Sequence, residues 1–273
     1  MKLIQVDQER CVKCGRCAAV CPRGLIRLDS EWPESDATEL CIACGQCVAV
    51  CPTAALDNSK APLAAQISLA NLPVTDPDTA SRFLRSRRST RCYKKIPVAR
   101  EKLLQLMDIV RFAPTGSNSQ GLSFRVIENA ETLRGITEQA VVWLEKQAAT
   151  GHSAAKSYAQ YAAVYRQTGR DVILRGAPCL ALGMALKVFP RGRENTHFSL
   201  AYAELYAPAL GLGTCWAGLF EAAVFSGFEP LVSLLGLPED KNLTGAIMVG
   251  HPDFGFCRLT DRNPLDIVFD THN

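Results

Sequence analysis

The clearest helical periodicity of apolar residues lies between residues 97 and 112. Leu103, Leu106, Met107 and Val110 occupy positions i, i+3, i+4 and i+7, and polar or charged residues fill several of the positions between them. This spacing places the four side chains on one face, which is typical of an amphipathic helix packed against a core. The segment therefore predicts a surface helix.

A turn and a short strand are predicted directly after this helix. The stretch APTGSNSQ (113–120) is rich in residues that favour turns. In SFRVIE (123–128), Phe124 and Val126 lie on the same side of an extended chain, which predicts a strand. Further along, the apolar segment FSLAYAELYAPAL (198–210) predicts another helix.

A segment without strong periodicity lies between the N-terminal part of the chain (1–58) and the remainder (81–273). Residues 59–80, SKAPLAAQISLANLPVTDPDTA, contain three prolines and favour a linker or a wrapping segment. The alternative is an ordered strand and helix, because LAAQISLANL is apolar enough to pack. With 273 residues the chain is long enough for two domains of unequal size.

No stretch of the sequence predicts a membrane span. The longest uncharged run, LYAPALGLGTCWAGLF (205–220), is sixteen residues long and is interrupted by Pro208 and by glycines. The first ten residues, MKLIQVDQER, have no apolar region typical of a signal peptide. We therefore expect a cytoplasmic protein with no membrane partner.

The charge distribution indicates two unlike domains. Residues 1–58 contain six basic and eight acidic residues, a balance of −2, and the remainder has 24 against 19, a balance of +5. The basic residues are densest in 81–100, with eight Lys or Arg and no carboxylate. A solvated surface, a nucleic-acid patch and a phosphate site are the three interpretations. Few aromatic residues are interspersed and the overall charge is low, so nucleic acid is not expected as a partner.

Eight of the twelve cysteines form two groups of regular spacing. Each group reads C-x2-C-x2-C-x3-C-P, as in CVKCGRCAAVCP and CIACGQCVAVCP, and the second copy follows thirty residues after the first. Disulfide frameworks rarely use such triplets, and paired zinc knuckles need closed sets of four ligands. The cysteines are Cys11, Cys14, Cys17, Cys21, Cys41, Cys44, Cys47 and Cys51.

This run is the signature of bacterial ferredoxins with two 4Fe–4S clusters, in which the fourth cysteine binds the other cluster. Residues 1–58 resemble such a ferredoxin. The signature assigns Cys11, Cys14, Cys17 and Cys51 to one cluster. Cys41, Cys44, Cys47 and Cys21 are assigned to the second.

The second part of the chain resembles the nitroreductase family of FMN flavoproteins. Four segments match in order: RRSTR (87–91) followed by IPV, then APTGSNSQ, GLGTCWAGLF (211–220) and VGHPDFGFCRLTDRNPLDIVFD (249–270). The family commonly has serine where Thr115 stands, and QPW where this chain has QGL (120–122). The resemblance extends over roughly residues 82–270.

The resemblance implies a set of cofactor contacts. Arg87, Arg88, Ser89 and Arg91 would hold the FMN phosphate and the ring edge, and Arg262 would approach the phosphate from the C-terminal segment. Family members bind FMN at a homodimer interface, so a homodimer is expected here. Pro114, Thr115 and Asn118 would reach the FMN of the partner subunit, while Gly218 and Leu219 would offer backbone amides near flavin N5. No catalytic side chain is assigned.

Together these observations predict an α+β fold. A small ferredoxin-like domain with two 4Fe–4S clusters (1–58) and a linker (59–80) precede a nitroreductase-like domain (81–273) with a mostly antiparallel central sheet flanked by helices. Two 4Fe–4S clusters and FMN are the expected cofactors.

The combined resemblance implies an FMN-dependent oxidoreductase. Its clusters would carry electrons to the flavin, which would reduce a small organic acceptor of nitro, quinone or enone type. An external ferredoxin, a flavodoxin or NAD(P)H would be the donor. Two alternatives stay open: an electron-transfer or redox-sensing protein that acts on a protein partner, and a dehydrogenase that runs in the opposite direction.

Overall fold

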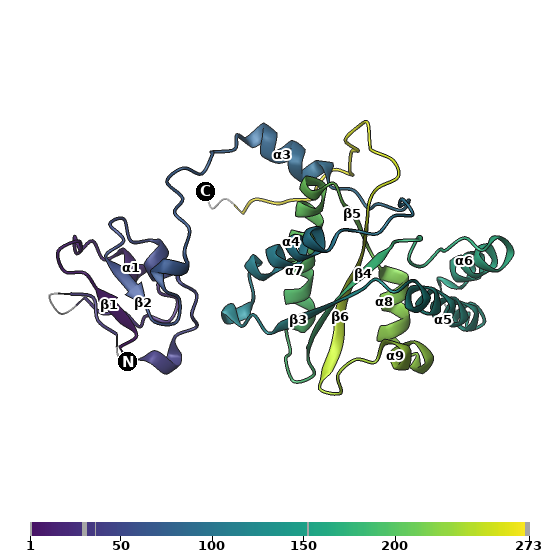
Figure 1. Cartoon of the computed structure of the whole chain (residues 1–273), viewed down its shortest axis with the longest axis horizontal. Coiled ribbons are helices and arrows are strands. Elements are labelled where there is room, and N and C mark those ends of the chain that lie inside the picture. Colours follow the sequence, from purple (N-terminus) through teal and green to yellow (C-terminus); the bar gives the residue numbers. More distant parts are fainter. Residues whose placement is uncertain (1, 29–31, 36, 152, 271–273) are drawn as a thin grey trace. The chain divides into compact units, whose positions relative to one another are not determined.

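A computed structural model describes all residues except 1, 29–31, 36, 152 and 271–273. The chain divides into two compact units (Figure 1). The first comprises Met1–Val74 with the short segment Thr115–Ser119, and the second comprises Thr75–Pro114 with Gln120–Asn273. The division after Val74 falls inside the segment 59–80, and the domain boundaries at 58 and 80 stay predictions.

The first unit is built on a small two-stranded sheet. Strands β1 (Ile4–Val6) and β2 (Leu56–Asn58) pair in antiparallel register, with Ile4 opposite Asn58. Its helices are short: α1 (Arg16–Ala19), η1 (Thr38–Leu40), α2 (Gln46–Ala49) and η2 (Leu63–Ala65). The buried apolar cluster consists of Leu3, Ile4, Ile26, Val48 and Leu56 together with Cys17 and Cys47.

The thirty-residue repeat of the sequence is also a repeat of the backbone. Helices α1 and α2 occupy equivalent positions, and each is preceded by a glycine in the left-handed region. Two further positions of each half share that conformation. The equivalent pairs, with their φ angles, are Lys13 and Ala43 (54° and 53°), Gly15 and Gly45 (76° and 70°), and Gly24 and Ala54 (60° and 50°).

The second unit is a four-stranded antiparallel sheet covered by helices on both faces (Figure 1). The strand order is β3-β4-β6-β5. The strands are β3 (Leu122–Ile127), β4 (Cys179–Leu186), β5 (Gly213–Trp216) and β6 (Lys241–Gly250). The helices are α3 (Pro77–Ser86), α4 (Arg100–Ile109), η3 (Val110–Phe112), α5 (Ala130–Ala148), α6 (Ala155–Thr168), α7 (Gly192–Tyr206), η5 (Ala207–Leu210), α8 (Gly218–Phe225) and α9 (Glu229–Leu235). Helix η4 (Gly116–Asn118) precedes β3 in the chain.

The central strands β4 and β6 are buried on both faces because their side chains alternate between two cores. Leu180 and Leu182 of β4 enter one core with residues of α5 and α8, whereas Ala181 enters the other with residues of α4 and α7. In β6, Met248 and Ile247 divide in the same way. This is the two-residue period of a strand applied to a sheet between helical layers.

The sequence-based elements agree with this architecture. The amphipathic pattern corresponds to α4, where Leu103 and Leu106 are buried, and the strand predicted at 123–128 corresponds to β3. The predicted α+β fold with a mostly antiparallel sheet is confirmed. Helix α3 was not predicted, although Ala80, Phe83 and Leu84 lie at helical spacing, and none of its residues is buried. Its local signals are Asp76, which caps Thr79 N at 3.0 Å, and Pro77 in the first turn.

Within the described part of the chain, no single helix has the length and apolar character needed to cross a membrane. Helices α8 and α9 pass this test only as a pair, and a bend of 107° separates them.

Helix α7 lies unusually close to the sheet at two glycines. A Cβ on Gly183 of β4 would fall well inside van der Waals contact with Thr196 Cγ2, and one on Gly245 of β6 would lie 2.8 Å from the same methyl. The register of the β4–β6 pair shifts between Gly183 and Met184. Beside this irregularity Thr244 Oγ1 lies 2.7 Å from Thr196 Oγ1, a buried hydrogen bond that ties the helix to the sheet.

We expect Gly183→Ala to lower the stability of the second unit by about 1–3 kcal/mol, because the added methyl overpacks the α7 contact. The measurement is thermal or denaturant unfolding followed by circular dichroism. Adding Thr196→Ser removes the opposing Cγ2 and retains the hydroxyl, so it should recover part of the loss. Gly255→Ala is the control, since a Cβ there meets nothing. Equal stability of Gly183→Ala and this control would contradict the packing argument.

Candidate functional site

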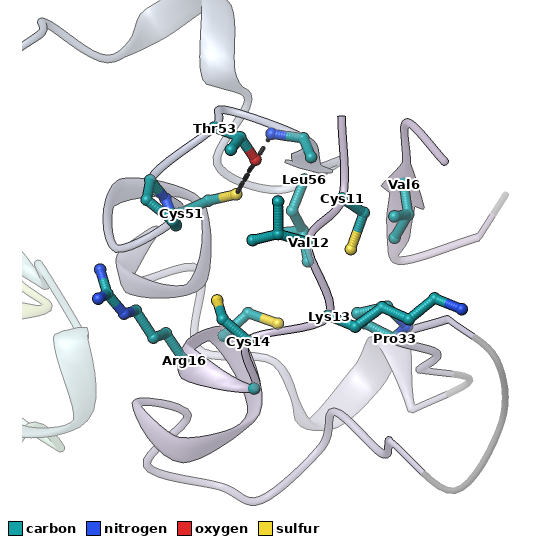
Figure 2. Close-up of a pocket in the computed structure, with 14 residues that line it drawn as sticks. Val6, Cys11, Val12, Lys13, Cys14, Arg16, Pro33, Cys51, Thr53 and Leu56 are labelled. Carbon is teal, nitrogen blue, oxygen red and sulfur yellow. Dashed lines mark hydrogen bonds between the residues drawn. The ribbon is translucent and has the colours of Figure 1, made fainter. Parts of the chain in front are cut away.

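The first of two small cavities in the first unit is lined by cysteines from both halves of the repeat. Cys11, Cys14 and Cys17 come from the first half and Cys51 from the second. Figure 2 shows the sulfurs of Cys11, Cys14 and Cys51 turned toward this cavity. Lys13 and Arg16 are among the residues that line it.

The second cavity repeats this arrangement with the halves exchanged. Cys41, Cys44 and Cys47 line it together with Cys21 from the first half. The structure therefore brings the eight cysteines together in the two sets that the sequence signature assigned. That each set binds an iron–sulfur cluster stays a prediction.

Four thiolates in each cavity are a donor set suited to an iron–sulfur cluster. Among the described residues, no three His, Cys, Asp or Glu side chains are close enough to hold one metal ion. In a 4Fe–4S cluster each thiolate binds a different iron, so the four sulfurs surround a larger volume than the ligands of one zinc ion do.

Hydrogen-bond donors point at several of the sulfurs, as thiolate ligands require. Leu25 N lies 3.4 Å from Cys21 Sγ, and the equivalent Ala55 N lies 3.2 Å from Cys51 Sγ. Burial raises the pKa of Cys51, but hydrogen bonds from Ala55, Thr53 and Leu56 outweigh this effect, so its pKa is lowered. The four-cysteine sets and their amide donors fit the chemistry of 4Fe–4S ligation.

In the second unit, the RRSTR segment lies against the edge strand β5. Ser89 forms a parallel bridge with Thr214, and Thr90 N donates to Thr214 O at 2.8 Å. Gly213 permits this close approach, because a Cβ there would collide with Thr90 Oγ1. These contacts hold the arginine-containing segment in an extended conformation beside β5.

The arginines of this segment have polar groups left over for a ligand. Arg88 Nε is buried and has no hydrogen-bond partner among the described residues, although the guanidinium lies over the ring of Phe256 at 5.9 Å. Arg87 Nη1 lies 3.5 Å from Glu204 Oε1. Buried donors are rarely left unsatisfied in proteins, so the orphaned Nε marks a place where an acceptor belongs.

Two carboxylates, the half-buried Glu204 and the buried Glu221, organise this region, and the sequence analysis missed both. Glu204 of α7 accepts from Thr214 Oγ1 at 3.4 Å as well as from Arg87, and burial raises its pKa while Arg87 opposes the rise. Glu221 of α8 accepts from Trp216 Nε1 at 2.7 Å and from Ala246 N, and burial raises its pKa. The available signal was their isolation among apolar residues, since a carboxylate there needs a partner.

Gly218 and Leu219 stand where β5 leads into α8. They are the first two residues of that helix, so their N–H groups have no acceptor within it. Gly218 is exposed and Leu219 is half-buried. Their amides can therefore donate to a ligand beside the strand end.

The remaining predicted contacts lie outside the RRSTR segment and outside the junction of β5 with α8. Pro114 follows η3, whereas Thr115 and Asn118 flank and end η4, with Asn118 in the left-handed region at φ 51°. Arg262 is exposed in the extended C-terminal segment, and the interaction seen for it is the bond from its N–H to Asp261 Oδ1 at 2.9 Å. None of the contacts described above joins Arg262 to the RRSTR segment.

Each of the two units matches the model of a known protein family or domain. Residues 84–251, more than half of the chain, match the model of the nitroreductase family, and residues 3–52 match the model of the 4Fe-4S dicluster domain. The chain therefore belongs to the nitroreductase family and carries a dicluster domain at its N-terminal end. The fusion inferred from the sequence is confirmed.

Individual relatives are distant. The chain is 26% identical over 170 residues to an iodotyrosine deiodinase of Thermotoga neapolitana, which covers 62% of this chain and 86% of the relative. It is 27% identical over 171 residues to an FMN reductase (NAD(P)H) of Bacillus subtilis, covering 62% and 64%. The fold is similar to that of a nitroreductase with bound FMN from Desulfitobacterium hafniense, with a TM-score of 0.56, 21% identity, and 69% and 97% of the two chains covered.

The crossed cysteine sets predict non-additive losses of iron. Cys51→Ala and Cys14→Ala should each disrupt the same cluster, so their combination should lose little more iron than either change alone. Cys51→Ala combined with Cys44→Ala should disrupt both clusters. Iron and sulfide content with EPR of the reduced protein measures this, and exposed Cys257→Ala is the control. Additive losses for Cys51 and Cys14 would contradict the crossed assignment.

Proposed function

We propose that this protein is an FMN-dependent oxidoreductase that receives electrons through its dicluster domain and reduces a small organic acceptor of nitro, quinone or enone type. The observation that carries the proposal is the coexistence, in one chain, of two four-cysteine cavities and a nitroreductase fold. A further support is the similarity to one relative named FMN reductase.

The residues of the second unit fit FMN at its phosphate end. The orphaned Nε of Arg88 needs an acceptor, and Arg87 and Ser89 lie next to it on the same segment. A phosphate supplies several acceptor oxygens, and guanidinium groups bind such anions with charge-assisted hydrogen bonds. We assign Arg87, Arg88, Ser89 and Arg91 to this end of the cofactor.

The supporting residues then have defined roles. Glu204 holds the Arg87 guanidinium against α7, and Thr214 shares that carboxylate. The amides of Gly218 and Leu219 would donate to the ring system, where donors near N5 tune the electronics of the flavin. When bound, FMN would supply the exchange between single electrons and the electron pair that the acceptor requires.

The count of electrons supports the pairing of the two units. A 4Fe–4S cluster transfers one electron, so two clusters hold the two electrons that a nitro or quinone group takes up with two protons. A reductant of low potential, such as an external ferredoxin or flavodoxin, would supply them. NAD(P)H is the alternative donor.

We further propose that the protein acts as a homodimer. Pro114, Thr115, Asn118 and Arg262 would complete the FMN site, the first three from the partner subunit. The proposal is supported by the exposed apolar side chains of the C-terminal segment, which include Phe269, 77% exposed.

Arg88→Gln should weaken FMN binding by roughly tenfold or more, because a charge-assisted hydrogen bond to the cofactor is lost. The measurement is a titration of FMN fluorescence with the deflavinated protein. Arg82→Gln changes an exposed arginine of α3 and should leave the affinity unchanged. Equal affinities of the two variants would contradict the assignment of Arg88.

Cys14→Ala should slow reduction of the flavin by reduced ferredoxin at least tenfold, while dithionite still reduces the flavin directly. The expected loss follows because the first cluster can no longer carry electrons in its normal form. Anaerobic stopped-flow absorbance of the flavin band measures both reactions, and FMN content shows that the second unit is intact. Unchanged reduction by every protein donor and by NAD(P)H would contradict electron entry through the clusters.

A further inference from the structure

The two halves of the dicluster domain share one backbone, and one of the positions beside the sulfurs at which they differ is residue 58. Residues thirty apart occupy equivalent places, as the paired left-handed positions Gly15 and Gly45 show. By this rule Asn58 of the second half corresponds to Leu28 of the first. The repeat thus places an amide donor in one half where the other has an alkyl group.

Asn58 is buried and fixed in its orientation. It is 3% exposed and ends β2 opposite Ile4. Its Oδ1 accepts from Lys60 N at 2.9 Å, which identifies the other side of the amide as the NH2 group. That Nδ2 lies 3.6 Å from Cys47 Sγ and 4.0 Å from Cys41 Sγ, so one side chain reaches two sulfurs of the second set.

Leu28, the equivalent residue of the first half, cannot make this contact. Leu28 is 42% exposed and cannot donate, and its Cδ1 packs near Gly15, 3.2 Å from the place of a Cβ. The side-chain donor of the first set is Thr53, whose hydroxyl lies 3.8 Å from Cys51 Sγ and reaches that sulfur alone.

Basic residues lie near both sets of cysteines. Lys13 and Arg16 line the first cavity. Arg23 lines the second, and Lys60 Nζ lies 3.4 Å from Cys41 O. Solvent access raises the reduction potential of the cluster in the first set relative to the second, because Cys14 is exposed and Cys44 is half-buried. A buried donor on the second set therefore acts against the effect of solvent.

We propose that Asn58 is a redox-tuning residue that selectively raises the reduction potential of the cluster held by Cys21, Cys41, Cys44 and Cys47. The proposal rests on the cluster binding assumed in the proposed function. Reduction adds negative charge that spreads onto the thiolates, so a donor to two of them stabilises the reduced form more than the oxidised form. Asn58 thereby shifts an electron shared by the pair toward the second cluster.

The test exchanges the two residues of the repeat in the full-length, cluster-loaded protein. Asn58→Leu should lower the potential of the second cluster and shift the partition of one electron between the clusters roughly tenfold toward the first. Leu28→Asn should raise the potential of the first cluster. Anaerobic potentiometric titration with EPR gives the potentials. The contact-shifted β-proton NMR signals of Cys47 and Cys17 assign each potential to its cluster.

An isosteric variant keeps the test decisive if Asn58→Leu loses its second cluster. Asn58→Asp replaces the donor by an anion, so it should lower the second potential further while iron and sulfide content stay at the wild-type level. Unchanged potentials in whichever Asn58 variants retain both clusters, or equal shifts of both clusters, would overturn the proposal. A wild-type protein without two clusters would instead overturn the proposed function, so the two failures are distinguishable.

Discussion

The dicluster domain depends on the crossing of one cysteine from each half of the repeat into the cavity of the other half. Cys21 lines the cavity of the second triplet and Cys51 that of the first, so neither cavity closes without both halves. The apolar core alone cannot hold the two halves together, because it is small and includes Cys17 and Cys47 themselves. A core of this size supplies little stability by itself, and many small domains add disulfides or metals. We therefore expect cluster assembly and folding to be coupled in this unit, as metal binding and folding are in other small metal domains.

In the second unit, the corresponding constraint is the close contact between α7 and the sheet. Glycines on β4 and β6 let Thr196 approach, and its bond to Thr244 fixes the helix along the sheet. The same helix carries Glu204 two turns further on, next to Thr214 of β5 and to Arg87. The position of the arginine segment thus depends on its own bridge to β5 and, through the contact of Arg87 with Glu204, on how α7 packs. A substitution that disturbs this packing would therefore displace the arginine segment without changing any of its residues.

The sequence predicted those features whose signal is local. Fixed cysteine spacing, the helical period of α4 and the ordered motifs of the second unit were sufficient for the fold and for the two sets of sulfurs. The partners of Glu204 and Glu221 were out of reach, because they come from strands and segments remote in sequence. Helix α3 was missed although its sequence carries signals for it: Asp76 and Pro77 stand at its start, and Ala80, Phe83 and Leu84 lie at helical spacing. Long-range hydrogen bonds, in contrast, leave little trace in a single sequence.

The internal repeat separates what the scaffold requires from what each half does. Equivalent positions keep the same left-handed backbone even where the residue differs, since Ala54 adopts the conformation that Gly24 adopts in the first half. The spacing and the backbone are therefore constraints that both clusters share, and they cannot make the clusters unequal. Differences between the clusters must come from positions where the repeat is broken, such as Leu28 and Asn58. In a protein with two such clusters, the residues that differ between the halves are the ones that can make one cluster easier to reduce than the other.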